Sequence, residues 1–213
     1  MATLSRATLQ KLAVLRALSL WKKKGAYGPL RLQKILFYAD KGNDPTRRLF
    51  TFKKWRLGQY SDEVSESLND LRRAGRMVGG FEGPAERLVP VLSPDAKRTV
   101  ENLFSRHFRE WTGALKVAFM ELAFLSNDAI IEKAHDDATY KHTEYGQEIF
   151  KHTLPEFVDL PHLHEDTAEM LADLVDTRLR KELVTRFKSA LERPVEYEDW
   201  RAIYFGEEAA KAS

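Results

Sequence analysis

The chain contains no cysteine, so it can form no disulfide, hold no thiolate-ligated metal and use no cysteine nucleophile. It also lacks any apolar run long enough to cross a bilayer, and charged and amide side chains interrupt its first residues, unlike a secretory signal. The chain also has no large excess of either charge: it contains 34 Lys and Arg and 32 Asp and Glu, which gives a net charge of +2. That balance gives no whole-molecule attraction for nucleic acid or an anionic membrane. We therefore expect a cytoplasmic protein with no membrane partner, on which any basic patch is local.

Motifs of common catalytic sites are absent too. The sequence has no G-x-S-x-G nucleophile elbow, no G-x-x-x-x-G-K-S/T phosphate loop and no G-x-G-x-x-G dinucleotide motif. Two stretches do carry several potential metal ligands: His135, Asp136, Asp137, His142 and Glu144 in one, and His162, His164, Glu165 and Asp166 in the other. Neither stretch has a spacing diagnostic of a metal site, so we interpret both as polar loop residues around helix ends. The sequence thus predicts no catalytic residue, no metal and no cofactor.

The composition that is present indicates a globular protein. Hydrophobic residues make up 43% of the 213 residues and charged residues 31%. We expect one domain over residues 1–155, followed by a helical C-terminal extension over residues 156–213 that packs on the domain or on a partner. The predicted boundary lies near Pro155–Pro161. The extension contains a predicted long helix, Asp166–Leu191, in which an apolar residue recurs at every fourth position.

The segment Tyr27–Val78 indicates the fold of the domain. Gly28-Pro29 opens a predicted helix that Gly42 closes in a left-handed conformation, with Leu32, Ile35 and Leu36 facing the core. Ser61 caps a second predicted helix, which Gly75 ends. The inward residues of that helix are Val64, Leu68 and Leu71.

Two short strands follow in this prediction. Arg76–Val78 is the first, a turn through Gly79-Gly80 comes next, and Arg87–Leu92 holds the second. This order is typical of a winged-helix-like core with a small β-hairpin. Together with additional C-terminal helices, the sequence predicts an α+β fold that is mainly α-helical.

The remaining segments are predicted to form helices and one loop. Apolar periodicity and caps predict the other helices before the extension at Ser5–Lys24, from Ser93 to Phe108, at Trp111–Leu125 and at Asn127–Ala134. From Asp136 to Pro161 the pattern weakens, and we expect an irregular loop.

Three motifs give the chain a resemblance to a known family. L-R-L-Q-K-I-L-F-Y-A at Leu30–Ala39 and W-R-L-G-Q-Y-S-D-E-V at Trp55–Val64 resemble the conserved segments of Panacea domains, the SocA-like antitoxin family. S-N-D-A-I-I-E-K-A-H-D-D-A-T-Y at Ser126–Tyr140 resembles the tail of that family. The resemblance implies a protein that neutralises a toxin by binding it, without catalysis of its own. It also gives His135 a structural role, which we expect to be closure of a helix C-terminus.

Four positions depart from the family pattern. Leu57 stands where an aromatic residue is usual, and Gln59 replaces the proline after the glycine. In the tail, Ala134 replaces a threonine and Tyr140 a tryptophan.

A candidate partner-binding surface lies around Phe50–Tyr60, where aromatic and basic residues alternate before an acidic helix start. Tyr, Trp and Arg dominate protein-interface energetics, and charges of both signs fix orientation. The residues expected to contact a cognate protein toxin are Lys53, Lys54, Trp55, Arg56, Tyr60, Asp62, Glu63 and Glu66. Only one face of a strand can pack on the core. We favour Phe52 in the core with Trp55 exposed over the reverse arrangement.

Two other functions remain as alternatives. A winged-helix transcriptional regulator would read DNA with the N-terminal residues of its second helix, but that helix begins with Asp62 and Glu63, which repel phosphate. We therefore expect the isolated chain to bind nucleic acid weakly. The third alternative, an enzyme of unknown type, lacks a catalytic constellation. The sequence leaves the oligomeric state open.

Overall fold

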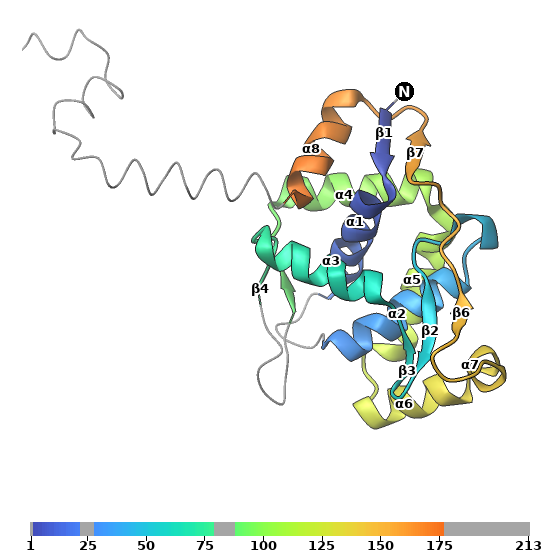
Figure 1. Ribbon diagram of the computed structural model, residues 1–213. Helices are drawn as coiled ribbons and strands as arrows, with labels where there is room; N and C mark the ends of the chain where they lie inside the picture. The colour runs from blue at the N-terminus through green and yellow to red at the C-terminus, as the bar shows by residue number, and fades with distance from the viewer. Residues whose placement is uncertain (1, 22–27, 79–87, 177–213) are drawn as a thin grey trace, which may run out of the picture. The chain divides into compact units, whose positions relative to one another are not determined.

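The computed structural model describes residues 2–21, 28–78 and 88–176 (Figure 1). They form one compact unit, which ends at Asp176. Within it, helices predominate and are joined by small antiparallel sheets, so the predicted mainly α-helical α+β class is confirmed. No helix of the described ranges combines the length and apolarity needed to span a membrane. The predicted Gly79-Gly80 turn and residues 177–213 lie outside the described residues.

The helices of the unit are α1 (Arg6–Ser19), α2 (Pro29–Lys41), the 3₁₀ helix η1 (Pro45–Arg47), α3 (Asp62–Arg73), α4 (Pro94–His107), α5 (Arg109–Leu122), α6 (Asn127–Asp136), α7 (Ala138–His142) and α8 (Glu165–Val175). Side-chain caps define several of their starts. Ser61 Oγ accepts a hydrogen bond from Val64 N–H at the start of α3, and Ser93 and Ser126 cap α4 and α6 in the same way. Gly75 ends α3 with φ of +69°, as predicted.

The strands form three small sheets, two of which join segments that are far apart in sequence. Strand β1 (Ala2–Ser5) pairs with β7 (Phe157–Leu160), and β4 (Met77–Val78) pairs with β5 (Val89–Pro90). The third sheet has the order β3-β2-β6, with β2 (Phe52–Trp55) in the centre between β3 (Gly58–Tyr60) and β6 (Glu148–Phe150). All pairs are antiparallel. Figure 1 shows β1 and β7 side by side, with α8 next to β1.

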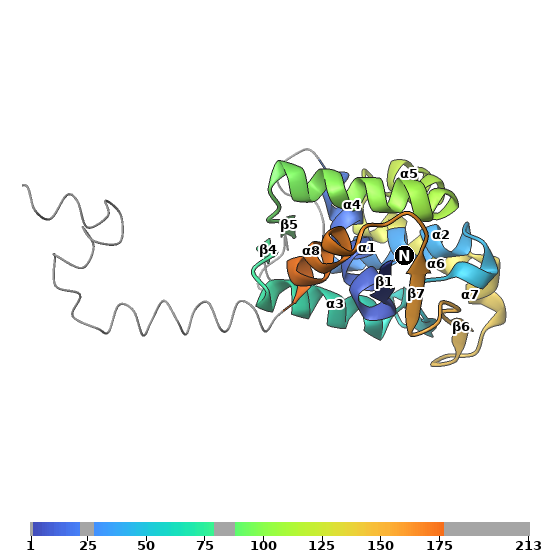
Figure 2. The same cartoon turned by 90° about the horizontal axis from the view of Figure 1, so that it is seen from above.

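The core lies where α1 and α2 meet the other elements. Helix α1 packs against α3, α4 and α8, whereas α2 packs mainly against α5 and β3. Leu32, Ile35 and Leu36 of α2 are fully buried, as predicted, and so are the inward residues of α3. In the view from above, α4 and α5 run along one side of the unit (Figure 2).

Helix α2 ends differently from the prediction. Gly42 has φ of −84°, so it is not left-handed. A Cβ atom at this position would lie 2.9 Å from Cβ of Ala114. Glycine is therefore needed here for the close approach of α2 and α5 rather than for a special backbone conformation.

Two further segments differ from the prediction. The predicted loop Asp136–Pro161 contains α7, β6 and β7, which are too short to show a clear period. Likewise, β1 occupies residues before α1 that carry no strand signal of their own. Both β1 and β7 become strands because each supplies the other with backbone partners.

The C-terminal part also departs from the prediction. Helix α8 begins at Glu165, without a side-chain cap from His164, and it ends at Val175 because Asp176 is extended, with ψ of 123°. The predicted continuous helix Asp166–Leu191 is therefore wrong at this point. Since β7 and α8 belong to the unit that ends at Asp176, the predicted boundary near Pro155–Pro161 lies inside that unit.

Candidate functional site

The sheet β3-β2-β6 turns one face to the core and the other to solvent. Phe52 is fully buried and packs against the rings of Phe37 and Phe150, at centroid distances of 5.3 and 5.6 Å. Side chains alternate along a strand, so Lys53 and Trp55 project from the opposite face. Trp55 is 44% exposed. The favoured arrangement, with Phe52 in the core and Trp55 exposed, is confirmed.

An aromatic cluster covers the solvent face of this sheet. The Trp55 ring stacks on Tyr145, with centroids 5.3 Å apart and 21° between the planes, and lies 6.3 Å from the Tyr60 ring. Lys53 Nζ lies 5.4 Å from the Trp55 centroid and 5.7 Å from the Tyr60 centroid, within cation–π range. It also forms an ion pair of 2.6 Å with Asp62. We name these five residues, Lys53, Trp55, Tyr60, Asp62 and Tyr145, the aromatic surface.

Tyr145 was missed by the sequence analysis. It lies in the turn before β6, where Gly146 N–H donates to Lys54 O at 3.0 Å and Lys54 N–H donates to Gln147 O at 2.9 Å. These bonds extend the pairing of β2 beyond β6 and bring Tyr145 beside Trp55. The only sequence signal was an aromatic residue before a glycine, inside a segment expected to be a loop.

Buried hydrogen bonds from α2 hold the strand β3 that carries Tyr60. The Gln33 side chain donates to Ser61 O and accepts from Ser61 N–H, both at 2.9 Å. Lys34 Nζ donates to Gln59 O, and the Gln59 side chain donates to Ala134 O at 3.0 Å. The Q-K pair of the first motif and the G-Q-Y-S segment of the second are therefore direct contact partners.

Gly58 begins β3 in a place that only glycine fits. Its φ is +96°, and a Cβ atom there would lie 2.7 Å from Cβ of Ala134 and 2.9 Å from Lys34 Nζ. The left-handed φ disfavours any residue with a side chain, and the close neighbours exclude even a methyl group. Gly58, Lys34 and Ala134, one from each motif, are thus packed against one another.

The third motif holds the turn between β2 and β3. His135 Nε2–H donates to Arg56 O at 3.2 Å, and Tyr140 Oη donates to Trp55 O at 2.9 Å. The two rings stack, with centroids 4.9 Å apart, and Lys54 Nζ lies 4.5 Å from the Tyr140 centroid. Burial raises the pKa of Tyr140, so its hydroxyl stays a donor. His135 lies in the last turn of α6, as expected, and its ring also holds the hairpin through Arg56 O.

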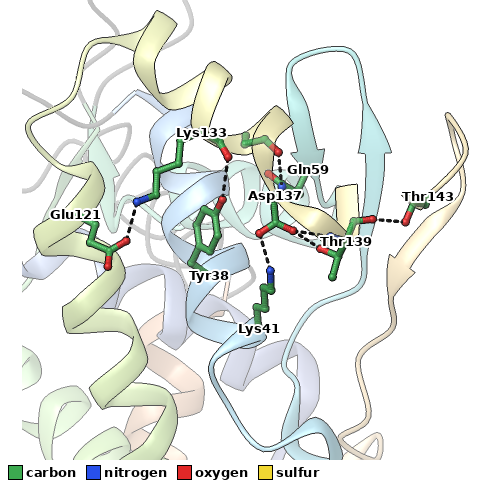
Figure 3. Close-up of polar contacts among 9 residues, drawn as sticks. Tyr38, Lys41, Gln59, Glu121, Lys133, Asp137, Thr139 and Thr143 are labelled. Carbon is green, nitrogen blue, oxygen red and sulfur yellow. Dashed lines mark hydrogen bonds and ion pairs between the residues drawn. The ribbon is translucent and has the colours of Figure 1, made fainter. Parts of the chain in front are cut away.

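A second set of contacts ties α2 to α6 and α7 (Figure 3). Tyr38 Oη donates to Lys133 O at 3.3 Å, and Lys41 forms an ion pair of 2.6 Å with Asp137. Asp137 also caps α7 by accepting from Thr139 N–H at 3.0 Å. Burial acts to raise the pKa of Asp137, but its hydrogen bonds with Lys41 and Thr139 lower it below the usual value. The carboxylate is therefore held in its charged form, in which it joins α2 to the start of α7.

Two titratable groups of α2 are buried in the unit. Burial lowers the pKa of Lys34 to about 7. Burial also raises the pKa of Asp40 to about 7, although its carboxylate accepts from Phe50 N–H at 2.7 Å and from Trp111 Nε1–H at 2.8 Å. Both groups use their polar atoms to support backbone or side chains of the core.

The structure divides the predicted contact residues into three groups. Lys53, Trp55, Tyr60 and Asp62 lie together on the aromatic surface. Glu63 is drawn into internal contacts instead, since it accepts from Thr51 N–H at 2.6 Å and lies 2.8 Å from His152 Nδ1. The other three are not part of it: Lys54 lies on Tyr140, while Arg56 and Glu66 have exposed side chains.

Neither of the two polar stretches forms a metal site in the described part of the chain, which holds no group of three or more potential ligands. No protein-family model matches the chain, and no curated protein matches it. The resemblance to Panacea domains therefore rests on the three motifs and not on a family match.

Proposed function

We propose that this protein is an antitoxin that neutralises a cognate protein toxin by direct binding, as the motif resemblance implies. The observation that carries the proposal is the meeting of the three motif segments around the β2–β3 hairpin. Residues of each segment hold the hairpin through buried contacts: Gln33 and Lys34 from the first, Gly58 and Gln59 from the second, and His135 and Tyr140 from the third. The hairpin in turn carries Trp55 and Tyr60 at the surface.

The aromatic surface suits recognition of a protein. Its rings are already stacked before a partner arrives, so binding would cost little side-chain entropy. Trp and Tyr supply apolar contact area, and they are the residue types most enriched among interface hot spots. Lys53 and Asp62 place a positive and a negative charge beside the rings, which would fix the orientation of the toxin. Neutralisation then follows when the bound antitoxin covers the toxin's active surface or its access to its target.

The proposal includes no reaction and no cofactor. The toxin acts inside the cell in such a system, so the proposal gives the protein a cytoplasmic location. Catalysis by this chain would require a set of reactive groups at one place. The buried Lys34 and Asp40 are instead engaged in hydrogen bonds that support the fold.

A winged-helix regulator remains the alternative function. Helices α1 to α3 and the β4–β5 pair occur in the required order, although β2 and β3 stand between α2 and α3. Asp62 and Glu63 lie in the first turn of α3, where a reading helix would approach phosphate. Lys53 forms an ion pair with Asp62, but DNA contacts require neutral or basic side chains where Asp62 and Glu63 lie.

Rescue of growth tests the proposal. The chain is co-expressed with the product of the adjacent reading frame, and we expect it to restore growth that the neighbour alone arrests. Trp55→Ala and Arg56→Glu are then compared with Phe157→Ala, which truncates an aromatic residue that is 62% exposed on a different sheet. We expect the Trp55 variant to bind about 30-fold more weakly, ~2 kcal/mol, while the Phe157 variant binds normally.

Three outcomes would contradict the proposal or its site. Folded Trp55 and Arg56 variants that both rescue fully would move the interface away from the aromatic surface. Absence of any rescue by the wild-type chain would remove the antitoxin function. Tight, salt-sensitive binding of the isolated chain to its own promoter DNA would favour the regulator instead.

A further inference from the structure

Helix α5 and the turn that follows it expose an apolar stripe on the side turned away from α2. Val117 is 57% exposed, and Met120 and Phe124 are each 75% exposed, the two most exposed large apolar side chains of the described residues. The face of α5 that packs inward carries Trp111, Leu115, Ala118 and Leu122. Val117 and Met120 lie outside this inward face and are not part of the buried core.

The stripe has the spacing of a helix-pairing seam. Within α5, Gly113, Val117 and Met120 follow one another at intervals of four and three residues, which is the a/d pattern of a coiled coil, and Phe124 lies in the turn that follows the helix. A Cβ atom at Gly113 would meet nothing within 4 Å, so this end of the seam is open to a neighbouring backbone. At the other end, the Phe124 ring packs 5.6 Å from Trp21 and 6.5 Å from Phe119, which fixes its position.

The charges beside the seam decide which partner fits. With Val117 at a and Met120 at d, Lys116 occupies g and Glu121 occupies e. In a parallel pair of helices, a g residue faces the e residue five positions later on the other helix. Lys116 would therefore meet Glu121 of a second copy, and Glu121 would meet Lys116. An antiparallel pair would place like charges together.

Both charges are available at the surface. Lys116 is exposed and makes no ion pair with any described residue. The Glu121 side chain is 52% exposed and forms a surface ion pair of 2.9 Å with Lys133. The seam thus carries a self-complementary set: an apolar centre with one cation and one anion in the positions that a two-fold axis relates.

We propose that the protein forms a homodimer in which α5 packs in parallel against α5 of a second copy through Gly113, Val117 and Met120, with Phe124 of the following turn at one end of the contact. The pairing goes beyond the antitoxin function and uses none of the aromatic surface, so each dimer would present two toxin-binding surfaces. Since α5 is short, the contact is smaller than a typical obligate interface, and the dimer dissociates on dilution.

Sedimentation of the full chain over a dilution series tests the pairing. We expect a monomer–dimer equilibrium for the wild type and a monomer at every concentration for Met120→Glu. Met170→Glu is the matched control, because Met170 is also an exposed methionine, 43% exposed on α8, and should leave the dimer unchanged. A wild-type chain that stays monomeric at the highest concentration would overturn the proposal, whether another segment or another protein covers the stripe. A dimer that survives Met120→Glu would overturn it equally.

Charge exchange tests the parallel arrangement. Lys116→Glu and Glu121→Lys each create two like-charge contacts across the axis, and we expect each to weaken the dimer roughly tenfold. A mixture of the two variants restores both opposite-charge contacts and should form a heterodimer of wild-type strength. If mixing restores nothing while the wild type dimerises, the helices do not pair in this register.

Cross-linking gives a readout that does not depend on affinity. The chain has no cysteine, so Met120→Cys introduces a single thiol. In a parallel pair the two d residues face each other across the axis, so mild oxidation should yield a disulfide-linked dimer. Met170→Cys, treated in the same way, should remain monomeric. Equal cross-linking of both variants would show random collision and would count against the seam.

Discussion

The β2–β3 hairpin and helix α5 both pack against α2, but different forces hold them there. The hairpin is fixed by side-chain hydrogen bonds from Gln33 and Lys34 to its backbone. Helix α5 is fixed mainly by apolar packing, with close approach at Gly42 and one buried hydrogen bond from Trp111. Polar contacts specify one geometry, whereas apolar packing tolerates small shifts. The aromatic surface, which suits the orientation of a partner, thus lies on the side of α2 that is held by polar contacts. The apolar stripe of α5, which suits burial alone, lies on the side that is held by apolar packing.

Truncation of a core residue of α2, the helix that both regions pack against, should give the largest loss of stability. Ile35 is fully buried on α2, and Ile35→Ala should lower the free energy of unfolding by about 2–5 kcal/mol. Such a change would disturb both surfaces at once. Denaturant unfolding measures it, with Leu57→Ala, a residue 48% exposed in the hairpin turn, as the control that should stay within about 0.5 kcal/mol. Equal stability of the Ile35 variant would mean that α2 does not connect the two sides.

A substitution in the β2–β3 hairpin alone should give the second-largest loss of stability. Gly58→Ala adds a clash to a left-handed φ, and we expect a loss of about 2–4 kcal/mol. Gly146→Ala isolates the first part of that cost, because Gly146 has φ of +80° but nothing within 4 Å of an added Cβ atom. It should lose only about 1 kcal/mol. Thermal unfolding compares the two, and similar losses would show that Ala134 and Lys34 move aside without cost.

The buried charges of α2 should give stability an unusual dependence on pH. The pKa of Asp40 rises to about 7 on folding, so the unfolded chain releases this proton first and stability falls as pH increases from about 4 to 7. The pKa of Lys34 falls to about 7, so stability rises again between about pH 7 and 10. The contribution of the pair is therefore smallest near neutral pH.

Substitutions separate the two limbs of this dependence. Relative to the wild type, Lys34→Met should remove the rise above pH 7, and Asp40→Asn should remove the fall below it. Each limb is expected to amount to a few kcal/mol. Unfolding midpoints measured from pH 4 to 10 provide the comparison. Parallel curves for the wild type and Lys34→Met would show that the lysine does not lose its proton on folding.

The smallest effect should come from the exposed rings themselves. A double-mutant cycle of Trp55→Ala and Tyr145→Ala should give a coupling energy of about 0.5–1 kcal/mol for the stacked pair. Met120→Ala and Val117→Ala should show no coupling in the monomer, because the stripe on α5 awaits a partner. A coupling of zero between Trp55 and Tyr145 would mean that the aromatic surface is not ordered before binding.

The fold could be predicted from the sequence wherever a segment carries its own signal. Caps and apolar periods located α2, α3, α4 and α6, because Ser61, Ser93 and Ser126 act within one turn of the chain. Strands β1, β6 and β7 were missed, since their pairing depends on residues far away in sequence. Helix α8 was extended too far because its period continues past Asp176, where the backbone turns extended.

The candidate site was predictable in the same way. Alternation along β2 gave the exposure of Trp55 and the burial of Phe52. It could not give the inward turn of Glu63, which follows from contacts with Thr51 and His152, or the place of Tyr145, which follows from the pairing of Gly146 with Lys54. Both depend on a segment more than 80 residues further along the chain, where local patterns carry no information.

The pairing of β1 with β7 affects how the chain folds during synthesis. Thr3 and Asp159, which share a hydrogen bond of 2.8 Å, are separated by 156 positions. The first strand must therefore wait on the ribosome until nearly the whole unit has been translated, a delay of about 10 s at ordinary elongation rates. During that time Ala2 and Leu4, which are buried in the finished unit, stay in water.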